Sequence, residues 1–446
     1  MFADIIVNIS HESVDRTFEY IIPEALEGQV RLGSQVNIPF GKGNRITKGY
    51  VVRVKNRAQF DPARLKAIIS VVDKSVNIDT EMLDLAVFIS RTFGGTMNQA
   101  LKTVLPVKSR SKPVTEKYVC LNLPEEEARS MAEKYASKKN TKAKARLSQE
   151  LLKEKAIPLS VARAKLNISD STIKALEKDG FIRMDVFENL RDVLRFKKSE
   201  EYLIVLNDAQ AMISEGIWHR YIKNDTRPSL IRGVTGSGKT EIYIDLIDKF
   251  IRQGKQAIVL IPEIALTYQT VMRFYRKFGD RVSMINSRMT PAERYDQVVK
   301  AKTGQIDIII GPRSALFTPF KDLGIVIIDE EHEGTYKNEN VPRYDARDVA
   351  IERMRSKGGI VVLGSATPSV DSYSRAKEGT YQLYTLDKRA KGARLADVEI
   401  VDLRNEMAMG NRSMISARLG DLIRDRLSKR QQIMLFINRR GYSSFV

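Results

Sequence analysis

Five short, almost uninterrupted apolar runs follow one another in the second half of the chain. They read QAIVLIP, RVSMI, QIDIIIG, GIVIIDE and GIVVLGS, and a segment with helical spacing separates each run from the next. Strands that are covered on both faces have this composition, because neither face has to meet water. The pattern therefore predicts an α/β fold with a doubly wound parallel sheet. Ligands of such sheets bind at the carboxyl ends of the strands.

A phosphate-binding motif follows a further candidate strand, PSLIRG. The segment Gly233–Thr240 reads GVTGSGKT and matches G-x-x-x-x-G-K-[ST] without a gap. In this motif the backbone amides at a helix N-terminus surround the phosphates of a nucleotide. We expect Lys239 to reach the β- and γ-phosphates of ATP and Thr240 to hold Mg²⁺. The other residues expected to line the site are Gly233, Gly236, Ser237 and Gly238.

A pair of carboxylates at the end of another apolar run supplies the second half of an ATPase site. The run IVII is followed by Asp329, Glu330, Glu331 and His332. We expect Asp329 to help hold Mg²⁺ and Glu330 to polarise the attacking water. An apolar run that ends in Asp-Glu often has a purely structural role. Its place after a complete P-loop favours the catalytic role here.

The chain carries a large excess of positive charge, with 74 Lys and Arg against 55 Asp and Glu and a net charge of +19. Such an excess indicates a polyanionic partner, either nucleic acid or an acidic membrane surface. Between Arg31 and Lys66 there are nine basic residues and one acid, Asp61. This strip is either a solvated basic face or a surface that meets phosphates.

Three regions precede the nucleotide-binding part. Residues 1–105 contain short alternating segments and glycines, which predict a β-rich domain built from hairpins. Residues 106–146 are rich in proline and lysine and are predicted to be a linker. Residues 147–190 show three short helical segments and a ribbon, typical of a winged helix. Lys174 and Lys178 on its third helix suit phosphates, although such bundles also serve as protein docks.

Several kinds of site are excluded by composition. Cys120 is the only cysteine, which rules out an internal disulfide and any zinc site in this chain built on two or more cysteines. The histidines His11, His219 and His332 are far apart in the sequence. No apolar run approaches the roughly 18–20 residues of a membrane span, and the start does not resemble a signal peptide. We expect a cytoplasmic chain without a membrane partner.

The motifs resemble those of a known family. GSGKT, DEEH and SATP, in this order, resemble superfamily 2 helicases. With LIPEIALTYQ, GPRSALF, the segment EGTYKNENVPRYDARDVA and LFINRRGYS, they are similar to the primosomal replication-restart helicases, the protein N′ or PriA family. RTFEYIIP and PFGKG near the start match the same family. The resemblance covers essentially the whole chain.

The resemblance implies a fold and a division of the chain. Residues 200–390 correspond to a RecA-like, ATP-binding first helicase lobe, and residues 391–446 to the beginning of a second lobe. The family's cysteine-rich zinc module and most of its second lobe are not in this chain, so the zinc expected for the family has no ligands here. Gln210 corresponds to the family's adenine-side glutamine.

The resemblance also implies two DNA sites. Family members hold a 3′-terminal nucleotide at positions that match Phe18, Glu19, Gly41 and Lys66, with the carboxylate accepting the 3′-OH. Glu19 departs from the more usual Asp. In the first lobe, Arg313 corresponds to a residue that touches the DNA backbone. In the loop between Glu333 and Arg347, aromatics and cations suit unpaired bases and phosphates, respectively. The matching residues are Tyr336, Lys337, Arg343 and Tyr344.

The resemblance implies an ATP-dependent 3′→5′ DNA helicase that recognises branched or stalled replication forks and initiates primosome assembly. Expected partners are forked and single-stranded DNA, single-stranded-DNA-binding protein, and primosome and helicase-loader proteins, in a nucleoid-associated location. Two alternatives stay open. One is a fork- and nucleotide-binding adaptor without productive unwinding, the behaviour expected if the chain ends at Val446. The other is a translocase that acts on RNA.

Overall fold

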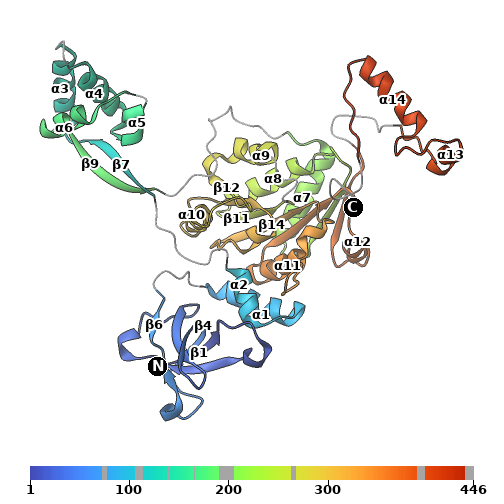
Figure 1. Cartoon of the computed structure of the whole chain (residues 1–446), viewed down its shortest axis with the longest axis horizontal. Helices are drawn as coiled ribbons and strands as arrows, with labels where there is room; N and C mark the ends of the chain where they lie inside the picture. Colours follow the sequence, from blue (N-terminus) through green and yellow to red (C-terminus); the bar gives the residue numbers. More distant parts are fainter. Residues whose placement is uncertain are drawn as a thin grey trace. The chain divides into compact units, whose positions relative to one another are not determined.

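The apolar runs form the strands of a parallel sheet in the computed structural model, which describes residues 1–72, 78–105, 114–137, 141–164, 166–189, 205–262, 268–388 and 397–436 (Figure 1). The sheet has the order β12-β13-β11-β14-β15-β10-β16, and neighbouring strands run parallel. The predicted doubly wound sheet is confirmed. Its strands are β10 (Ser229–Gly233), β11 (Gln256–Leu260), β12 (Val282–Met284), β13 (Ile308–Gly311), β14 (Leu323–Asp329), β15 (Ile360–Ser365) and β16 (Gln382–Leu386).

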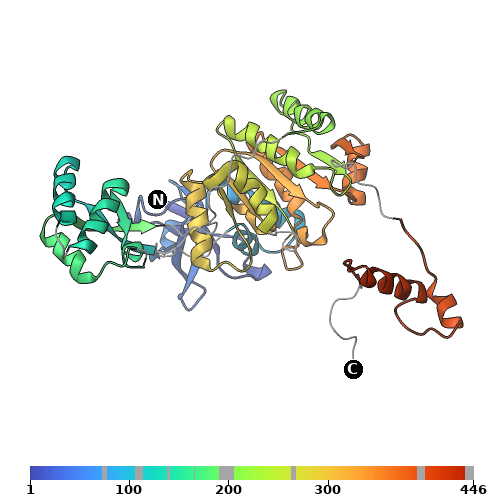
Figure 2. The same cartoon turned by 90° about the horizontal axis from the view of Figure 1, so that it is seen from above.

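Helices cover both faces of this sheet (Figure 1 and Figure 2). Alternate residues of β11 enter opposite cores. Ala257 and Val259 pack with side chains of α7, α8 and α9, whereas Ile258 and Leu260 pack with those of α10, α11 and α12. The helices are α7 (Asp208–Ile222), α8 (Lys239–Arg252), α9 (Tyr268–Phe278), α10 (Pro291–Lys302), α11 (Ala346–Lys357) and α12 (Val370–Lys377).

The N-terminal residues form a β-rich sheet of their own, as the sequence predicts. The sheet has the order β5-β2-β1-β4-β3-β6. Ile5, Val36, Ile38 and Val51 are completely buried in its core. The strands are β1 (Phe2–Val7), β2 (Thr17–Ile21), β3 (Gln35–Phe40), β4 (Arg45–Lys55), β5 (Lys66–Ala67) and β6 (Ser70–Val71).

Two helices follow this sheet, α1 (Thr80–Phe93) and α2 (Met97–Val104). Thr96 and Gln99 form a capping box at the start of α2, which satisfies two backbone N–H groups there. The apolar side chains of both helices share one core with those of α11. An ion pair reinforces this contact, because Nε of the completely buried Arg353 on α11 donates to Oε1 of Glu81 on α1 at 2.6 Å.

The predicted linker at 106–146 is wrong for most of its length. β7 (Val114–Leu121) and α3 (Glu125–Ser137) lie within it, and α4 (Lys142–Glu154) begins there. These elements share a core with β8 (Ala156–Pro158), α5 (Leu159–Ala164), α6 (Asp170–Lys178) and β9 (Ile182–Asn189). Lys134 lies on α3, and Lys142 and Lys144 lie on α4. The first of these helices buries only a narrow stripe, which includes Ala128 and Ala132.

The ribbon predicted after the third helix of this region pairs with a strand far away in the sequence. β9 is antiparallel to β7, from Val114 opposite Asn189 to Leu121 opposite Ile182. The resulting sheet has the order β8-β7-β9 and carries α3 to α6. Ser169 caps α6, because its side chain accepts from the backbone N–H of Thr172.

The chain divides into two compact units, Met1–Lys391 and Gly392–Val446. In the described part of the second unit, α13 (Leu403–Ala408) and α14 (Ala417–Ser428) contain no buried residue.

Among the described residues, no helix combines the length and the apolar character needed to cross a membrane.

Candidate nucleotide and DNA sites

The phosphate-binding loop joins the end of β10 to the start of α8, as the motif predicts. Gly236 and Gly238 have φ angles of 78° and 86°, in the left-handed region that favours glycine. At Gly238 any side chain is also excluded by space, because a Cβ atom there would lie 2.1 Å from Nε2 of Gln210. The loop conformation therefore requires the glycines of the motif.

The motif lysine lies inside this loop. Nζ of Lys239 is buried and donates to the carbonyl oxygen of Gly233 at 2.9 Å. The hydroxyl of Ser237 is buried and has no hydrogen-bond partner among the residues described. A buried polar atom without a partner indicates a position for a ligand. Both observations fit a loop that can give its donors to a nucleotide phosphate.

Gln210 braces the same loop from α7. Its Nε2 donates to the carbonyl oxygen of Ser237 at 2.8 Å. Its Oε1 accepts from the backbone N–H of Asn207 at 3.0 Å, within the capping box that begins α7. The structure thus gives the Gln210 amide a supporting role in the loop. Contact with an adenine ring stays a prediction.

The two candidate catalytic carboxylates follow β14. Oδ1 of Asp329 accepts from the Tyr243 hydroxyl at 3.0 Å, and burial raises the pKa of Asp329 above its ordinary range. Burial, together with the charge of Asp329, also raises the pKa of Glu330. Glu330 has a φ of 46°, a strained backbone position that is typical of functional sites.

Magnesium fits this set of residues. The Thr240 hydroxyl and the Asp329 carboxylate supply hard oxygen ligands, which Mg²⁺ prefers alongside nucleotide phosphates. Asp329 is partly buried at the end of β14, and the neighbouring Lys239 charge favours its ionised form. A desolvated carboxylate of this kind gains more from a bound cation than an exposed one does.

Hydrogen bonds connect the DEEH motif to the GSATPS motif. Nδ1 of His332 lies 2.7 Å from Oγ of Ser365. The carboxylate of Glu331 is completely buried and accepts from the Ser369 backbone N–H at 2.7 Å and from the Ser372 hydroxyl at 2.8 Å. Arg347 holds the same carboxylate at 3.3 Å. These contacts join the two motifs directly in this conformation.

The structure does not support base stacking by the two tyrosines of the loop after DEEH. Tyr336 and Tyr344 are only 1% and 4% exposed. The Tyr336 hydroxyl donates to the carbonyl oxygens of Asp329 and Leu260, at 2.6 Å and 3.1 Å. Both rings belong to the core, so neither offers a face to DNA in this conformation. The cations of the loop, Lys337 and Arg343, are exposed.

Arg313 supports this loop. Its Nη1 donates to the carbonyl oxygens of Thr335 and Lys337, at 3.1 Å and 2.7 Å. The guanidinium thus joins the GPRS motif to the segment that carries Lys337. Direct contact of Arg313 with DNA stays a prediction.

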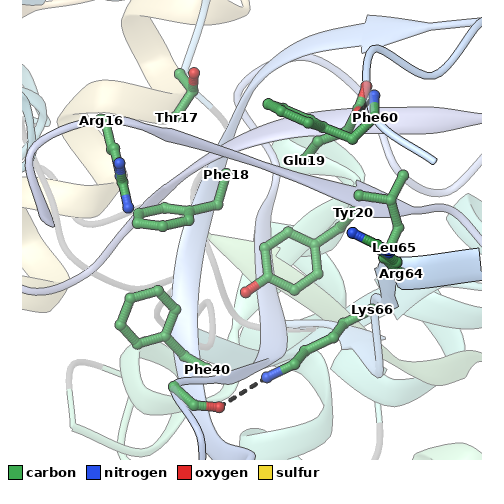
Figure 3. A pocket seen from close by; sticks show the side chains of 11 residues that line it. Arg16, Thr17, Phe18, Glu19, Tyr20, Phe40, Phe60, Arg64, Leu65 and Lys66 are labelled. Carbon is green, nitrogen blue, oxygen red and sulfur yellow. Dashed lines mark hydrogen bonds between the residues drawn. The ribbon is translucent and has the colours of Figure 1, made fainter. Parts of the chain in front are cut away.

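The four residues predicted for a 3′-terminal nucleotide lie together in the N-terminal domain (Figure 3). They line a pocket of about 560 Å³. Nζ of Lys66 donates to the carbonyl oxygen of Gly41 at 2.7 Å, which closes one side. The Phe18 ring meets the Phe40 ring edge-on, with centroids 5.1 Å apart. The lining residues are Arg16, Thr17, Phe18, Glu19, Tyr20, Phe40, Gly41, Phe60, Arg64, Leu65 and Lys66.

Glu19 is engaged in a way that the family resemblance did not predict. Its side chain is 2% exposed and forms an ion pair with Lys55 at 2.7 Å. The backbone N–H groups of Gln59 and Phe60 also donate to it, each at 3.0 Å. Burial acts to raise the pKa of Glu19, but Lys55 and the two N–H groups outweigh it and keep the pKa lowered. The carboxylate holds a loop, so the expected role as a free acceptor of a 3′-OH does not match this conformation.

Sequence reasoning missed several residues of the pocket, namely Arg16, Phe40, Phe60 and Arg64. Arg16 belongs to the quoted motif RTFEYIIP. Phe40 belongs to the motif PFGKG and directly precedes the predicted residue Gly41. Strand alternation could have placed Arg16, which lies two residues before Phe18, since residues two apart share a face. Phe60 and Arg64 come from the connection between β4 and β5, where no local pattern indicates a site. Residues 263–267 of the motif LIPEIALTYQ and residues 437–443 of the motif LFINRRGYS lie outside the described residues.

Comparisons with known families and curated proteins agree with this geometry. Residues 4–106 match the model of a 3′ DNA-binding domain, and residues 209–376 match that of a DEAD/DEAH box helicase. The replication restart protein PriA of Bacillus subtilis is 33% identical over 100% of this chain and 63% of its own length. PriA of Chlamydia muridarum is 32% identical over 100% of this chain and 59% of its own. The chain thus spans about three fifths of these relatives.

Among solved structures, RecG bound to a three-way DNA junction matches 71% of this chain and 35% of its own, with 19% identity and a TM-score of 0.32. The helicase MrfA bound to DNA and AMPPNP matches 50% of this chain and 32% of its own, with 18% identity and a TM-score of 0.35.

Proposed function

The chain belongs to the family of the replication restart protein PriA, and from this we propose that it acts at stalled or branched replication forks as an ATP-dependent 3′→5′ DNA helicase. One observation carries the proposal. A single chain combines a pocket suited to a DNA end with a parallel sheet whose strand ends carry a P-loop and a DEEH motif. An adaptor that only binds DNA and nucleotide needs the P-loop but has no need of a catalytic carboxylate such as Glu330.

The nucleotide site divides its tasks among residues already located. The loop amides bind the phosphates, and Lys239 exchanges the Gly233 carbonyl oxygen for a phosphate oxygen. Thr240 and Asp329 would hold Mg²⁺, which would neutralise phosphate charge when bound. Glu330 orients the attacking water and accepts its proton. The raised pKa of Glu330 suits this role, because a base works best when its pKa approaches the ambient pH.

The bonds between motifs provide a route from nucleotide to DNA. Glu331 joins the DEEH motif to Ser369 and Ser372, and through Arg347 to the segment that follows the exposed cations Lys337 and Arg343. We propose that these cations hold the DNA backbone and move with the state of the nucleotide. Single-stranded-DNA-binding protein, helicase loaders and other primosome proteins complete the proposed set of partners.

Fork binding tests the DNA part of the proposal. Fluorescence anisotropy is measured with a forked DNA whose 3′ end is free at the junction and with the same fork whose 3′ end is blocked by a bulky group. We expect the free end to bind about tenfold more tightly, roughly 1.4 kcal/mol, because only a free end enters the pocket. Equal affinities would contradict recognition of the 3′ end. An RNA fork that binds as well as the DNA fork would favour the RNA translocase.

A further inference from the structure

Phe60 is a large apolar side chain that is 65% exposed on the wall of a pocket (Figure 3). The other aromatic rings of this pocket have partners. The Tyr20 side chain is buried, and its hydroxyl donates to the Pro39 carbonyl oxygen at 3.1 Å. The Phe18 ring lies against the Phe40 ring. The guanidinium carbon of Arg16 lies over the Phe18 ring, 5.1 Å from the centroid of that ring. Phe60 therefore presents the most accessible ring of the pocket.

The backbone of Phe60 is fixed although its side chain is exposed. Oε2 of Glu19 accepts from the N–H groups of both Gln59 and Phe60, and Oε1 accepts from Gln59 and from Lys55. Lys55 is in turn held by Asp4 at 2.7 Å. Burying charges is costly unless they are paired and hydrogen-bonded, as they are here. This bonding fixes the backbone from which an exposed ring projects, which a simple connection between β4 and β5 does not require.

Cations surround the same opening. Arg16, Arg64 and Lys66 line the pocket, and the Glu19 carboxylate is paired with Lys55. The Arg64 side chain is largely exposed, and its ion pair with Asp61 is long, at 3.9 Å. Such a surface pair is weak. A ring with open faces beside cations matches the chemistry of a nucleotide, which offers a flat base and an anionic phosphate.

We propose that Phe60 stacks on the base of the terminal nucleotide in this pocket, and that Glu19 is the positioning residue that holds Phe60 in place. This inference rests on the proposed function and names a residue that neither motifs nor resemblance indicate. Stacking on an aromatic side chain tolerates every base, so the pocket recognises an unpaired end without reading its sequence.

The test uses a single-stranded oligonucleotide with 2-aminopurine as its 3′-terminal base, because the fluorescence of this base is quenched when it stacks. We expect wild-type protein to quench it and to leave a 2-aminopurine placed several nucleotides inward unchanged. Phe60→Ala should abolish the quenching and weaken binding about 5- to 100-fold, the range for loss of one base–aromatic stack. Phe60→Tyr should retain both.

Two further variants separate stacking from folding. Ile46→Ala is the matched control, since Ile46 is 66% exposed on β4 of the same domain and does not line the pocket. It should quench like wild type. Glu19→Gln should lose most of the quenching with an unchanged far-ultraviolet circular dichroism spectrum, because the loop loses its charged anchor.

The outcomes distinguish this inference from the proposed function. Two outcomes would overturn the role of Phe60 and leave the proposed function intact. One is a preference for a free 3′ end without any change in terminal 2-aminopurine fluorescence, and the other is full quenching by the Phe60→Ala variant. Absence of any preference for a free 3′ end would instead contradict the proposed function on which it rests.

Discussion

At the scale of single residues, Lys239 is the most direct test of the nucleotide site. Lys239→Ala removes a buried charged donor that the P-loop offers to phosphate. We expect affinity for an ATP analogue to fall about 10- to 100-fold, since a hydrogen bond to a charged group contributes about 1.5–3 kcal/mol. Fork affinity without nucleotide should hardly change, because the pocket and the P-loop belong to different sheets. A large loss of DNA affinity in a titration without nucleotide would refute this separation.

The pH dependence of stability tests the environment of Asp329 in the same site. Burial raises its pKa above the ordinary 3.8. The folded protein therefore binds this proton more tightly than the unfolded chain, and stability falls as pH rises from about 3.8 through the raised pKa. Asp329→Asn keeps an oxygen for the Tyr243 hydroxyl but carries no charge.

The free energy of unfolding of Asp329→Asn at pH 7 should therefore exceed that of wild type, by about 0.5–2 kcal/mol. Mg²⁺-dependent nucleotide affinity should fall. Urea unfolding at several pH values measures the difference, which should shrink as pH falls below the raised pKa. A variant that is less stable than wild type at pH 7 would show that the buried charge is favourable.

The residues whose roles were predicted from sequence lie in local motifs, whereas those whose environment was not predicted depend on contacts with distant parts of the chain. Lys239 and Asp329 belong to motifs in which neighbouring residues define the role, so local order suffices. The environment of Tyr336 depends on Leu260, 76 positions away, and that of Glu19 on residues 40 positions away. Burial of this kind is decided by tertiary packing, which a linear motif does not record.

At the scale of elements, the parallel strands were predictable because each is a short apolar run with both faces covered. β16 escaped prediction, since it is a strand at the edge of the sheet and most of its residues are only partly buried. The prediction of a linker at 106–146 was wrong because the sequence there lacks the apolar runs that revealed the other elements. The helices of this segment expose lysines on wide polar faces, and the partner of β7 is β9, whose pairing begins about sixty residues later.

The contact between α1 and α11 gives a test at this scale. Arg353 is completely buried, and besides Glu81 it donates to the carbonyl oxygens of Leu316 and Thr318. Glu81→Ala leaves this guanidinium without its counter-ion. We expect the free energy of unfolding to fall by about 3 kcal/mol, the lower end for breaking a buried pair.

Thermal or urea unfolding measures this loss. The matched control is Asp84→Ala, an exposed carboxylate one turn further along α1, which should change stability by less than about 0.5 kcal/mol. If both variants unfolded alike, the buried pair would contribute nothing beyond a surface charge.

At the scale of the whole molecule, net charge and the order of the motifs together favour the proposed action on nucleic acid. The net charge of +19 by itself also suits a membrane surface as partner. The 3′ DNA-binding domain and the helicase domain found by comparison favour DNA. The bonds that connect the motifs, from Glu331 to Ser369 and Arg347, depend on tertiary packing and have no signature in the motifs themselves.

The central claim is that one chain couples a DNA end to a nucleotide site. The most direct measurement is the affinity for a fluorescent, non-hydrolysable ATP analogue with Mg²⁺, with and without saturating forked DNA. We expect DNA to tighten nucleotide binding at least about fivefold, a coupling of roughly 1 kcal/mol, and Lys239→Ala to remove most of the binding in both cases. Nucleotide affinity that is unchanged by a fork that demonstrably binds would contradict the account.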